Sequence, residues 1–415
     1  MGARYDIGEN ETRCMRVAVL GGGVVGVVTA WYLVKEGHAV TVFDRAEGVA
    51  CGTSHANAGQ LSYSFTDALA RPEFLRRLPS VLLGCDPGIA VRAKTTGSLV
   101  RWGSAFIREC TAARARDNTI SVLRLAMRSA ALMEQLMAEL PLEFSFSRAG
   151  KLVLLSRQAE LEAAARSIAL KEQYGCSTEL LRRDDVLQLE PSLAFWRDEF
   201  IAAIWSSNDH VADARSFTVG LAKKLEMEHG VLFCLGETVT GLGLRHGRAR
   251  TVITEKGVQD TDAVVVCLGA ESGRLLRALG IRLPICPVRG YSITLPAGRQ
   301  APSISVSHAG HRIVLSRLGH KLRIAGFADF AGFDTRDDRL RTDTLLRLAR
   351  RIAPLAADYA SADLKRWGGD RPMTPDGRPR VGPSKIPGLF LNTGHGMLGW
   401  TLACATGQTV AESIG

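Results

Sequence analysis

Apolar runs and glycine-bearing turns alternate at the start of the chain. Residues 16–20 form a short apolar run that contains two valines and predicts a buried strand. Residues 24–34 continue apolar at helical length, and Gly37 follows where a helix would end. Residues 39–43 predict a second strand, which Asp44 follows directly. The pattern is that of a strand, a glycine turn, a helix and a second strand.

The turn carries Gly21, Gly23 and Gly26 in a GxGxxG arrangement. In a dinucleotide-binding unit the first glycine makes the tight turn, the second admits a pyrophosphate to backbone N–H groups, and the third lets the helix pack on the strand. Asp44, about 20 residues further on, can accept hydrogen bonds from a ribose diol. The unit therefore predicts a dinucleotide site, without separating FAD from NAD. Its structural alternative is a glycine turn in an ordinary α/β domain.

The other apolar patterns divide the chain into two kinds of region. Residues 263–268 are all apolar and end at Gly269, where a parallel strand would meet a bound nucleotide. Alternating runs between 285 and 327 are antiparallel in character. Further helices are predicted at 119–139, 158–174, 213–229, 340–357 and 401–413, and residues 72–116 predict helices broken at Pro79 and at 86–88. The nucleotide-binding elements are thus spread over three segments, with a second domain inserted between them.

Composition and charge narrow the possibilities. The chain has 415 residues, nine cysteines without paired spacing, and a formal net charge of +10. We expect free thiols in a reducing compartment and no metal site of clustered cysteine and histidine. Residues 66–128 carry 11 basic against 5 acidic side chains. This excess of positive charge indicates either a membrane-facing surface or an ordinary solvated one. Aromatic residues are not interleaved with the basic ones, so the pattern does not favour binding of single-stranded nucleic acid. Residues 1–14 predict a flexible polar leader and no signal peptide. Residues 17–34 are uncharged, but their glycines and strand pattern argue against a membrane span.

Two further loops have the composition of a cofactor site. Residues 51–65 are small, polar and glycine-bearing, and they follow Asp44 closely. Residues 394–399 are glycine-rich and precede the last predicted helix, whose N-terminus would present a partial positive charge to a ligand. An isoalloxazine ring gathers negative charge near N1 on reduction, so this second loop favours FAD over NAD.

Several motifs together resemble the D-amino acid dehydrogenase family, a branch of the D-amino acid, glycine and sarcosine oxidases. They are the N-terminal unit, ANAG at 56–59, VRGYS at 288–292, RPMTPDG at 371–377 and NTGHGMLGWTLACATG at 392–407. The resemblance implies a Rossmann-like α/β FAD-binding domain built from discontinuous segments, plus an inserted α+β substrate domain with an antiparallel sheet. We assign residues 15–80, 204–280 and 366–415 to the former, and 81–203 and 281–365 to the latter.

The same resemblance implies an activity. The family binds FAD non-covalently and oxidises D-amino acids to imino acids, by hydride transfer from the substrate Cα to flavin N5. The imino acids hydrolyse to 2-oxo acids and ammonia, and the electrons pass to a quinone or another acceptor. The chain departs from the family pattern at Gly369–Asp370 and at residues 209–213. Both places are expected near the substrate, so D-proline or D-hydroxyproline is an alternative substrate.

The resemblance also implies which residues act on the substrate. We expect Arg371 to clamp the substrate carboxylate, because a guanidinium grips a carboxylate through two hydrogen bonds. Tyr291 could add a hydroxyl to the same carboxylate. His395 lies among the glycines expected to face the flavin, and contact with the ring is favoured over action as a base. His308 and His210 are weaker candidates.

The remaining site residues are expected to bind the cofactor, with Arg45 beside the adenosine ribose. No metal is expected. The set comprises Gly21, Gly23, Val24, Val25, Gly26, Asp44, Arg45, Ser54, Asn57, Ala58, Gly59, Gln60, Leu61, Val239, Gly269, Gly394, Gly396, Met397, Leu398, Gly399, Trp400 and Thr401.

Three other readings of the sequence stay open at this point. The enzyme could be an amine oxidase that uses oxygen, the chain could be a non-catalytic FAD-binding module at a membrane surface, or it could be one subunit of a larger complex. For the leading hypothesis we expect a cytoplasmic protein, peripheral on the inner face of the plasma membrane, with a D-amino acid substrate, an acceptor such as a quinone, and no nucleic acid.

Overall fold

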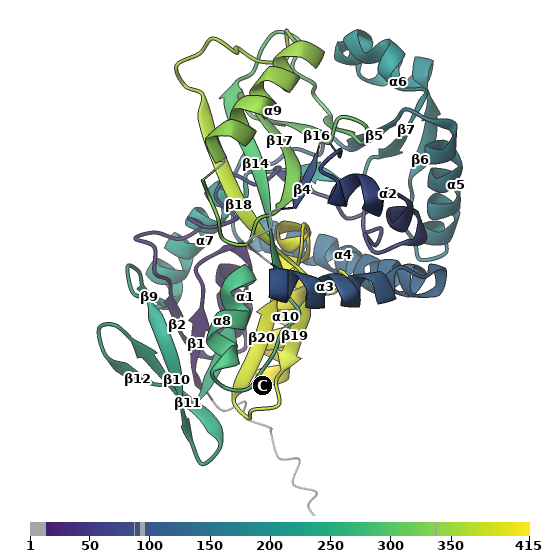
Figure 1. The fold of residues 1–415 in the computed structure, drawn as a ribbon. Coiled ribbons are helices and arrows are strands. Elements are labelled where there is room, and N and C mark those ends of the chain that lie inside the picture. Colours follow the sequence, from purple (N-terminus) through teal and green to yellow (C-terminus); the bar gives the residue numbers. More distant parts are fainter. Residues whose placement is uncertain (1–13, 87, 92–95, 337) are drawn as a thin grey trace, which may run out of the picture.

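The structure is a computed structural model, and it describes residues 14–415 except 87, 92–95 and 337. The leader expected at residues 1–14 therefore lies, apart from Cys14, outside the described residues. Two large sheets organise the two halves of the molecule (Figure 1).

The first sheet has six strands in the order β19-β20-β13-β1-β2-β9. Neighbours pair in parallel, except for β19, which runs antiparallel to β20. The valine-rich sequences of the central strands suit a parallel sheet that is buried on both faces. The strands are β1 (Arg16–Leu20), β2 (Ala39–Phe43), β9 (Leu232–Cys234), β13 (Ala263–Val266), β19 (Arg380–Pro383) and β20 (Leu389–Thr393).

Helices cover one face of this sheet. Helix α1 (Val24–Lys35) packs on α10 (Gly399–Ile414), and α10 packs on α4 (Ala112–Glu139). Helix α7 (Ala214–His229) also packs on α1. Asp213, the first residue of the helix predicted at 213–229, caps α7, because its Oδ1 atom accepts hydrogen bonds from the N–H groups of Arg215 and Ser216.

A smaller layer covers the opposite face. It contains a three-stranded antiparallel sheet and a short helix, whose apolar side chains share one core with β1 and β13. Its elements are β10 (Val239–Arg245), β11 (Arg248–Thr254), β12 (Val258–Asp260), the 3-10 turn η3 (Gly269–Glu271) and α8 (Ser272–Arg277).

The second large sheet has nine strands, ordered β18-β14-β17-β16-β15-β5-β7-β6 with β4 beside β17. Most neighbours are antiparallel, as the alternating sequence runs predict. The strands are β4 (Ile89–Val91), β5 (Lys151–Leu155), β6 (Glu179–Arg182), β7 (Ala202–Ser206), β14 (Cys286–Pro296), β15 (Ser305–His308), β16 (Ile313–Leu318), β17 (Lys321–Phe330) and β18 (Lys365–Met373). A two-stranded pair, β3 (Gln60–Leu61) and β8 (His210–Val211), is separate from it.

Shorter helices accompany the second sheet. Helix α9 (Asp338–Ile352) packs on β14, β17 and β18. The others are α2 (Pro72–Leu82), α3 (Thr96–Glu109), α5 (Gln158–Glu172), α6 (Arg183–Leu189) and the 3-10 segment η2 (Pro191–Glu199). Within the described part of the chain, no helix is both long enough and apolar enough to cross a membrane.

Some local expectations were wrong. Helix α2 runs through Pro79 without a break, because a proline removes one backbone hydrogen bond and a short exposed helix can tolerate that loss. Helix α4 begins at residue 112 rather than 119, since the Thr111 hydroxyl caps it. The sequence predicts a strand only at residues 364–367, but β18 continues to Met373 because its second half pairs with β14. The expected break at 86–88 includes residue 87, which lies outside the described residues.

We propose the division into a cofactor-binding unit (15–80, 204–280, 366–415) and a substrate unit (81–203, 281–365) as a description of the chain. The packing does not follow this division everywhere. Helix α4 falls in the second unit, yet it shares a core with α1 and α10. Strand β18 falls in the first, yet it is an edge strand of the nine-stranded sheet.

Candidate active site

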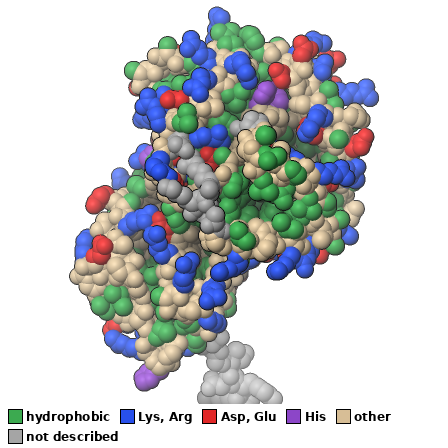
Figure 2. Space-filling model, viewed as in Figure 1, with side chains coloured by type: hydrophobic (Ala, Val, Ile, Leu, Met, Phe, Trp, Pro, Cys, Tyr) green, Lys and Arg blue, Asp and Glu red, His purple; other side chains and the backbone are tan. Residues whose placement is uncertain are grey.

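A cavity of about 1340 Å³ lies between the two large sheets. Its lower side consists of residues that follow β1, β2 and β13, where the carboxyl ends of parallel strands meet, and its upper side of residues on β14, β17 and β18. On the face drawn in Figure 2, apolar side chains gather around the hollow between the two halves. The volume exceeds the roughly 300–1,000 Å³ of an ordinary ligand pocket, so a dinucleotide and a small substrate have space together.

The first glycine loop is shaped by steric contacts that only glycine allows. Gly21 has φ +113°, and a Cβ there would lie 2.7 Å from the carbonyl oxygen of Cys267. A Cβ on Gly26 would lie 1.8 Å from the carbonyl oxygen of Gly21. Gly26 therefore does not line the cavity but permits α1 to approach β1. Gly23, Val24 and Val25 line it, and α1 begins there with a glycine at its N-cap and no acidic residue in its first turn. Its N-terminus can thus attract a phosphate.

Asp44 and Arg45 lie at the end of β2 and line the same cavity. The Asp44 carboxylate accepts a 2.7 Å hydrogen bond from the Gly22 N–H and a 2.9 Å bond from the Ala46 N–H. This fixes the carboxylate against the glycine loop and leaves acceptor capacity for a ribose hydroxyl.

Arg45 forms two hydrogen bonds with the carboxylate of Glu271, at 2.8 and 2.5 Å, so its guanidinium is already paired.

The 51–65 loop reaches the cavity as predicted, but not with every residue. Ser54, Asn57, Ala58 and Gln60 line it, and the Ser54 Oγ accepts a 3.1 Å hydrogen bond from the Val24 N–H at the start of α1. The side chain of Gln60 instead donates to serines of β15. Gly59 packs against Leu318 and Leu61 is fully buried, so neither faces the cavity.

The second glycine loop approaches the cavity from the opposite end of the chain. Gly396, Met397, Leu398, Gly399, Trp400 and Thr401 line the cavity, as do Val239 and Gly269. Gly394 does not; it has φ +77° and packs on Thr374, so it shapes the loop from behind. Helix α10 begins at Gly399 without a side-chain cap, which leaves its first N–H groups available to a ligand.

These features fit FAD. Two helices, α1 and α10, begin at the cavity, one beside the phosphate-type glycine loop and the other beside Gly396. Neither is capped by the side chain of its own N-cap residue, and in α1 the Ser54 Oγ engages only the Val24 N–H. The first suits a pyrophosphate, and the second can stabilise negative charge on a flavin ring. The substrate side of the cavity lies above both loops.

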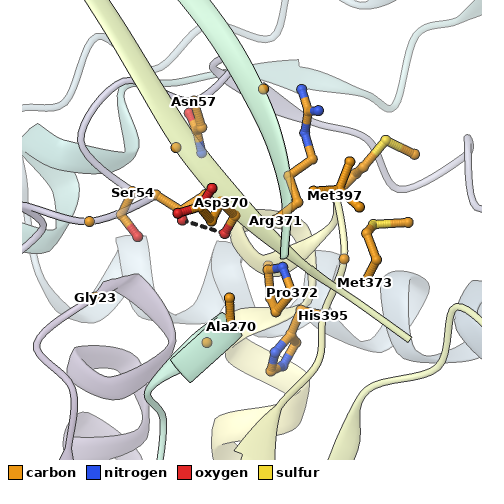
Figure 3. A pocket seen from close by; sticks show the side chains of 18 of the residues that line it. Gly23, Ser54, Asn57, Ala270, Asp370, Arg371, Pro372, Met373, His395 and Met397 are labelled. Atoms are coloured by element: carbon orange, nitrogen blue, oxygen red, sulfur yellow. Dashed lines mark hydrogen bonds between the residues drawn. The ribbon is translucent and has the colours of Figure 1, made fainter. Parts of the chain in front are cut away.

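Arg371 extends into the cavity from β18. Its Nη1 donates a 2.9 Å hydrogen bond to the carbonyl oxygen of Phe327, and among the described residues it forms no ion pair with a carboxylate. A Cβ on Gly290, in the neighbouring strand, would lie 2.2 Å from its Nη2, so the glycine makes room for the guanidinium. Burial lowers the pKa of Arg371, but an arginine remains charged. In Figure 3 the Arg371 side chain and the His395 ring extend in opposite directions.

Tyr291 lines the cavity but is only 2% exposed. Its hydroxyl donates a 2.9 Å hydrogen bond to Asp329, whose other carboxylate oxygen accepts from Arg341 at 2.8 Å. The hydroxyl is therefore engaged inside the sheet. This position gives Tyr291 a role in ordering β14 and β17 beside Arg371.

Of the three candidate histidines, only His395 lines the cavity. The His395 ring is buried, and its Nε2 is 3.1 Å from the hydroxyl of Thr406 on α10. Burial lowers its pKa to about 4, so the ring is neutral at physiological pH. His395 contributes to the cavity from the loop, but this arrangement does not favour action as a base. His210 and His308 do not line the cavity at all.

Lys151 on β5 is a cavity residue that the sequence analysis missed. Its Nζ donates a 2.8 Å hydrogen bond to the Ser62 hydroxyl and lies 4.4 Å from the centre of the Phe65 ring. Burial lowers its pKa to about 8, and the nearby Asp209 carboxylate opposes that shift. The available signal was a lysine directly after Gly150 in an otherwise apolar strand.

The two departures from the family pattern have structural partners. Asp370 accepts a 3.0 Å hydrogen bond from Arg289 of the VRGYS motif, which also pairs with Asp338. In the second departure, Asp209 accepts from the Ser64 N–H, and Asp213 caps α7. Both departures therefore have structural partners within the protein, although Asp370 also lines the cavity (Figure 3).

The fold and the cavity define a flavin-nucleotide site beside a pocket that contains Arg371, and comparisons with known proteins agree on the flavin nucleotide. The family model described as FAD-dependent oxidoreductase (DAO) matches residues 16–413. "D-amino acid dehydrogenase" of Rhizobium johnstonii is 37% identical over 403 residues, with 97% of this chain and 96% of that protein covered. "D-amino acid dehydrogenase 2" of Ralstonia nicotianae is 40% identical over 409 residues, with 96% of each covered.

Solved structures show the same fold. L-proline dehydrogenase from P. horikoshii has a TM-score of 0.73 at 23% identity, with 96% of this chain and 93% of that chain covered. Glycine oxidase from Geobacillus kaustophilus has a TM-score of 0.73 at 24% identity, with 96% and 95% covered. The chain belongs to the family of FAD-dependent oxidoreductases, and its cofactor is FAD.

Proposed function

We propose that this enzyme oxidises D-amino acids to 2-oxo acids and ammonia and passes the electrons to a quinone or another acceptor. The observation that carries the proposal is Arg371, a cavity guanidinium with no carboxylate partner among the described residues, placed beside the flavin-type loop at Gly396. A charged group in a largely apolar cavity is stabilised when a ligand of opposite charge binds to it. The names of the relatives that share 37% and 40% identity support a D-amino acid as that ligand.

The residues of the chain perform the positioning. The Phe327 carbonyl fixes one side of the Arg371 guanidinium, and Gly290 leaves space on the other. A substrate carboxylate held there through two hydrogen bonds would direct its Cα toward the loop at Gly396. FAD, when bound, accepts the hydride from Cα. The amine must be neutral for that step, and the imino product is then hydrolysed by water. Phe65, Ile89 and Phe330 form apolar walls that limit water around the substrate.

The acceptor can be tested by steady-state turnover. Purified enzyme is assayed with D-alanine, D-proline and D-hydroxyproline and with the L forms, using a water-soluble quinone or dye as acceptor and, separately, oxygen uptake. The proposal expects D-selective reduction of the quinone or dye with little oxygen consumption. Fast oxygen consumption would instead identify an oxidase, and the fastest D substrate separates the D-alanine and D-hydroxyproline alternatives.

We also propose that helices α2 and α3 contact a membrane surface, where a quinone would be reached. Leu82 at the end of α2, Leu83 directly after it and Val100 on α3 are 66%, 77% and 70% exposed. The exposed Arg76 and Arg101 lie on the same two helices. Apolar and basic residues together favour an anionic lipid surface. Binding to anionic vesicles is expected to fall when Leu82, Leu83 and Val100 are replaced by serine, while turnover with a soluble dye is retained. Unchanged binding would contradict this proposal.

A further inference from the structure

Glu199, His308 and His311 form a cluster outside the active-site cavity. Each offers a nitrogen or oxygen ligand atom, and these three atoms lie within 4.8 Å of one another. His308 ends β15, His311 lies in the turn that leads to β16, and Glu199 ends η2. The cluster therefore joins the turn between β15 and β16 to the end of η2, which lies more than a hundred positions earlier in the sequence.

The two histidines are already arranged as neighbouring ligands. Their ring centroids are 4.4 Å apart, and the Nε2 of His311 is 3.2 Å from the Glu199 carboxylate. In a tetrahedral zinc site with bonds of about 2.0–2.2 Å, adjacent ligand atoms lie roughly 3.3–3.5 Å apart. The His311–Glu199 pair has nearly this spacing. Glu199 is exposed and can rotate to adjust the third distance.

His308 supplies a second, independent sign of a missing partner. Its side chain is 2% exposed, and its Nε2 has no hydrogen-bond partner. The Nδ1 accepts a long hydrogen bond of 3.3 Å from the His311 N–H. Trp196 contacts the ring edge to face, with centroids 5.6 Å apart, and so fixes its orientation. A buried polar atom without a hydrogen-bond partner is destabilising, and a bound ion would supply the missing partner.

We propose that Glu199, His308 and His311 bind one divalent transition-metal ion of the zinc type. Two imidazoles and one carboxylate are a ligand set that Zn²⁺ accepts, with water in the remaining position. The two histidines are three residues apart in a tight turn, where Arg312 has φ +57°. The alternative is a surface ion pair between His311 and Glu199 beside an unrelated core histidine. That alternative leaves the His308 Nε2 unexplained.

The ion would stabilise a turn that also reaches the active site. Arg312, the residue after His311, lines the cavity and is 3.5 Å from the Asp86 carboxylate. A cation bound between the turn and η2 would fix the backbone from which Arg312 extends. We therefore assign the ion a structural role at the edge of the substrate pocket, without contact with the reacting atoms.

The test uses tag-free holoenzyme that has been treated with a chelator and then titrated with Zn²⁺ by calorimetry, and with Co²⁺ by visible absorption. We expect one ion per chain for the unmodified enzyme. His311→Ala and Glu199→Gln each remove one ligand, so affinity is expected to fall by about tenfold or more. The matched control is His320→Ala, which removes an exposed histidine from the next hairpin turn of the same sheet.

The variants change exposed or half-buried side chains, so they are expected to fold, and retained flavin absorbance confirms this. Binding must be lost in His311→Ala and Glu199→Gln but kept in His320→Ala. The absence of saturable binding in the unmodified enzyme would overturn the proposal. Equal binding in all variants would overturn it as well, by placing the ion elsewhere.

Discussion

The two sides of the active-site cavity are built differently. The cofactor side consists mainly of backbone: Gly21, Gly23 and Gly396 line it, and helices α1 and α10 begin there. The substrate side consists mainly of side chains, including Arg371, Tyr291 and Lys151, which reach the cavity from strands distant in sequence. Where backbone lines the cavity, few substitutions are tolerated, so we expect the cofactor specificity to resist change. Where side chains line it, a single substitution can alter the contacts with the substrate, so we expect the substrate specificity to change more easily.

The largest effect is expected from a substitution that disrupts the cofactor side of the cavity. In Gly26→Ala the added methyl group would lie 1.8 Å from the Gly21 carbonyl oxygen, so α1 must move away from β1. We expect loss of bound FAD and a large drop in stability, measured by the flavin absorbance per chain and the thermal midpoint. Gly103→Ala on α3, where nothing lies within 4 Å, is the control. A Gly26→Ala enzyme with full flavin content would contradict this account.

The second largest effect is expected from a substitution that disrupts the substrate side of the cavity while FAD stays bound. Arg371→Met is expected to lower kcat/KM by roughly 10²–10³-fold, since losing one partner of a buried charge pair removes about 2–5 kcal/mol. Gly290→Ala should act in the same direction by displacing the guanidinium. Arg366→Met on the same strand loses a pair with Asp343 on α9 and should leave turnover nearly unchanged. Equal effects of Arg371→Met and Arg366→Met would refute the carboxylate clamp.

A third prediction concerns the stability of the substrate side against pH. Lys151 has its pKa lowered from 10.5 to about 8 by burial. Between these values the unfolded chain holds a proton that the folded chain has lost, so this group makes stability rise with pH from about 8 to about 10.5. Below pH 8 the buried charge is destabilising, by about 3 kcal/mol for such a shift. Lys151→Met should therefore raise the free energy of unfolding at pH 7 and remove the rise above pH 8.

Lys171 is the comparison for this stability measurement, because it is a buried lysine with a carboxylate partner. Lys171 is also buried, but its Nζ is 2.9 Å from the Asp67 carboxylate. Lys171→Met leaves that carboxylate without its partner and should destabilise the enzyme at pH 7. Chemical denaturation at about pH 7 and about pH 9.5 compares the two variants. If Lys151→Met also destabilises at pH 7, the lysine charge is needed in the folded state.

A smaller effect is expected at Tyr291. Because its hydroxyl donates to Asp329, Tyr291→Phe should lower the free energy of unfolding by about 1 kcal/mol. The change in KM should stay below about fivefold, since that factor is near 1 kcal/mol. A KM increase as large as that of Arg371→Met would show that the hydroxyl binds the substrate carboxylate after all.

The smallest effect on the pH profile is expected at His395. Its ring is neutral above about pH 4, so it does not titrate near the ordinary histidine value. His395→Asn should leave the acidic limb of the kcat/KM profile at the same pH, even if the flavin loop is loosened and the rate falls. Disappearance of that limb would assign the titration to His395.

The difference between the two sides also explains what the sequence could predict. Gly21, Gly23 and Asp44 lie within one short strand–helix–strand unit, and their spacing alone predicted a dinucleotide site. Arg371 was found only through a resemblance, because its neighbours Phe327 and Gly290 reach it through strand pairing over distances of 44 and 81 positions in sequence. Lys151 was missed because its burial depends on Ser62 and Phe65, which no local pattern connects to β5. The C-terminal end of β18 was also missed, because the second half of this strand is held by pairing with β14, which is distant in sequence.

The most direct test of the central claim is the visible spectrum of the purified enzyme under anaerobic conditions. D-alanine, D-proline or D-hydroxyproline is added, and each L form serves as its control. The account predicts a flavin spectrum that a D-amino acid bleaches and its L form does not, and that Arg371→Met retains the flavin but bleaches far more slowly. A flavin spectrum that no D-amino acid bleaches, or that D and L forms bleach equally, would contradict the proposed substrate class.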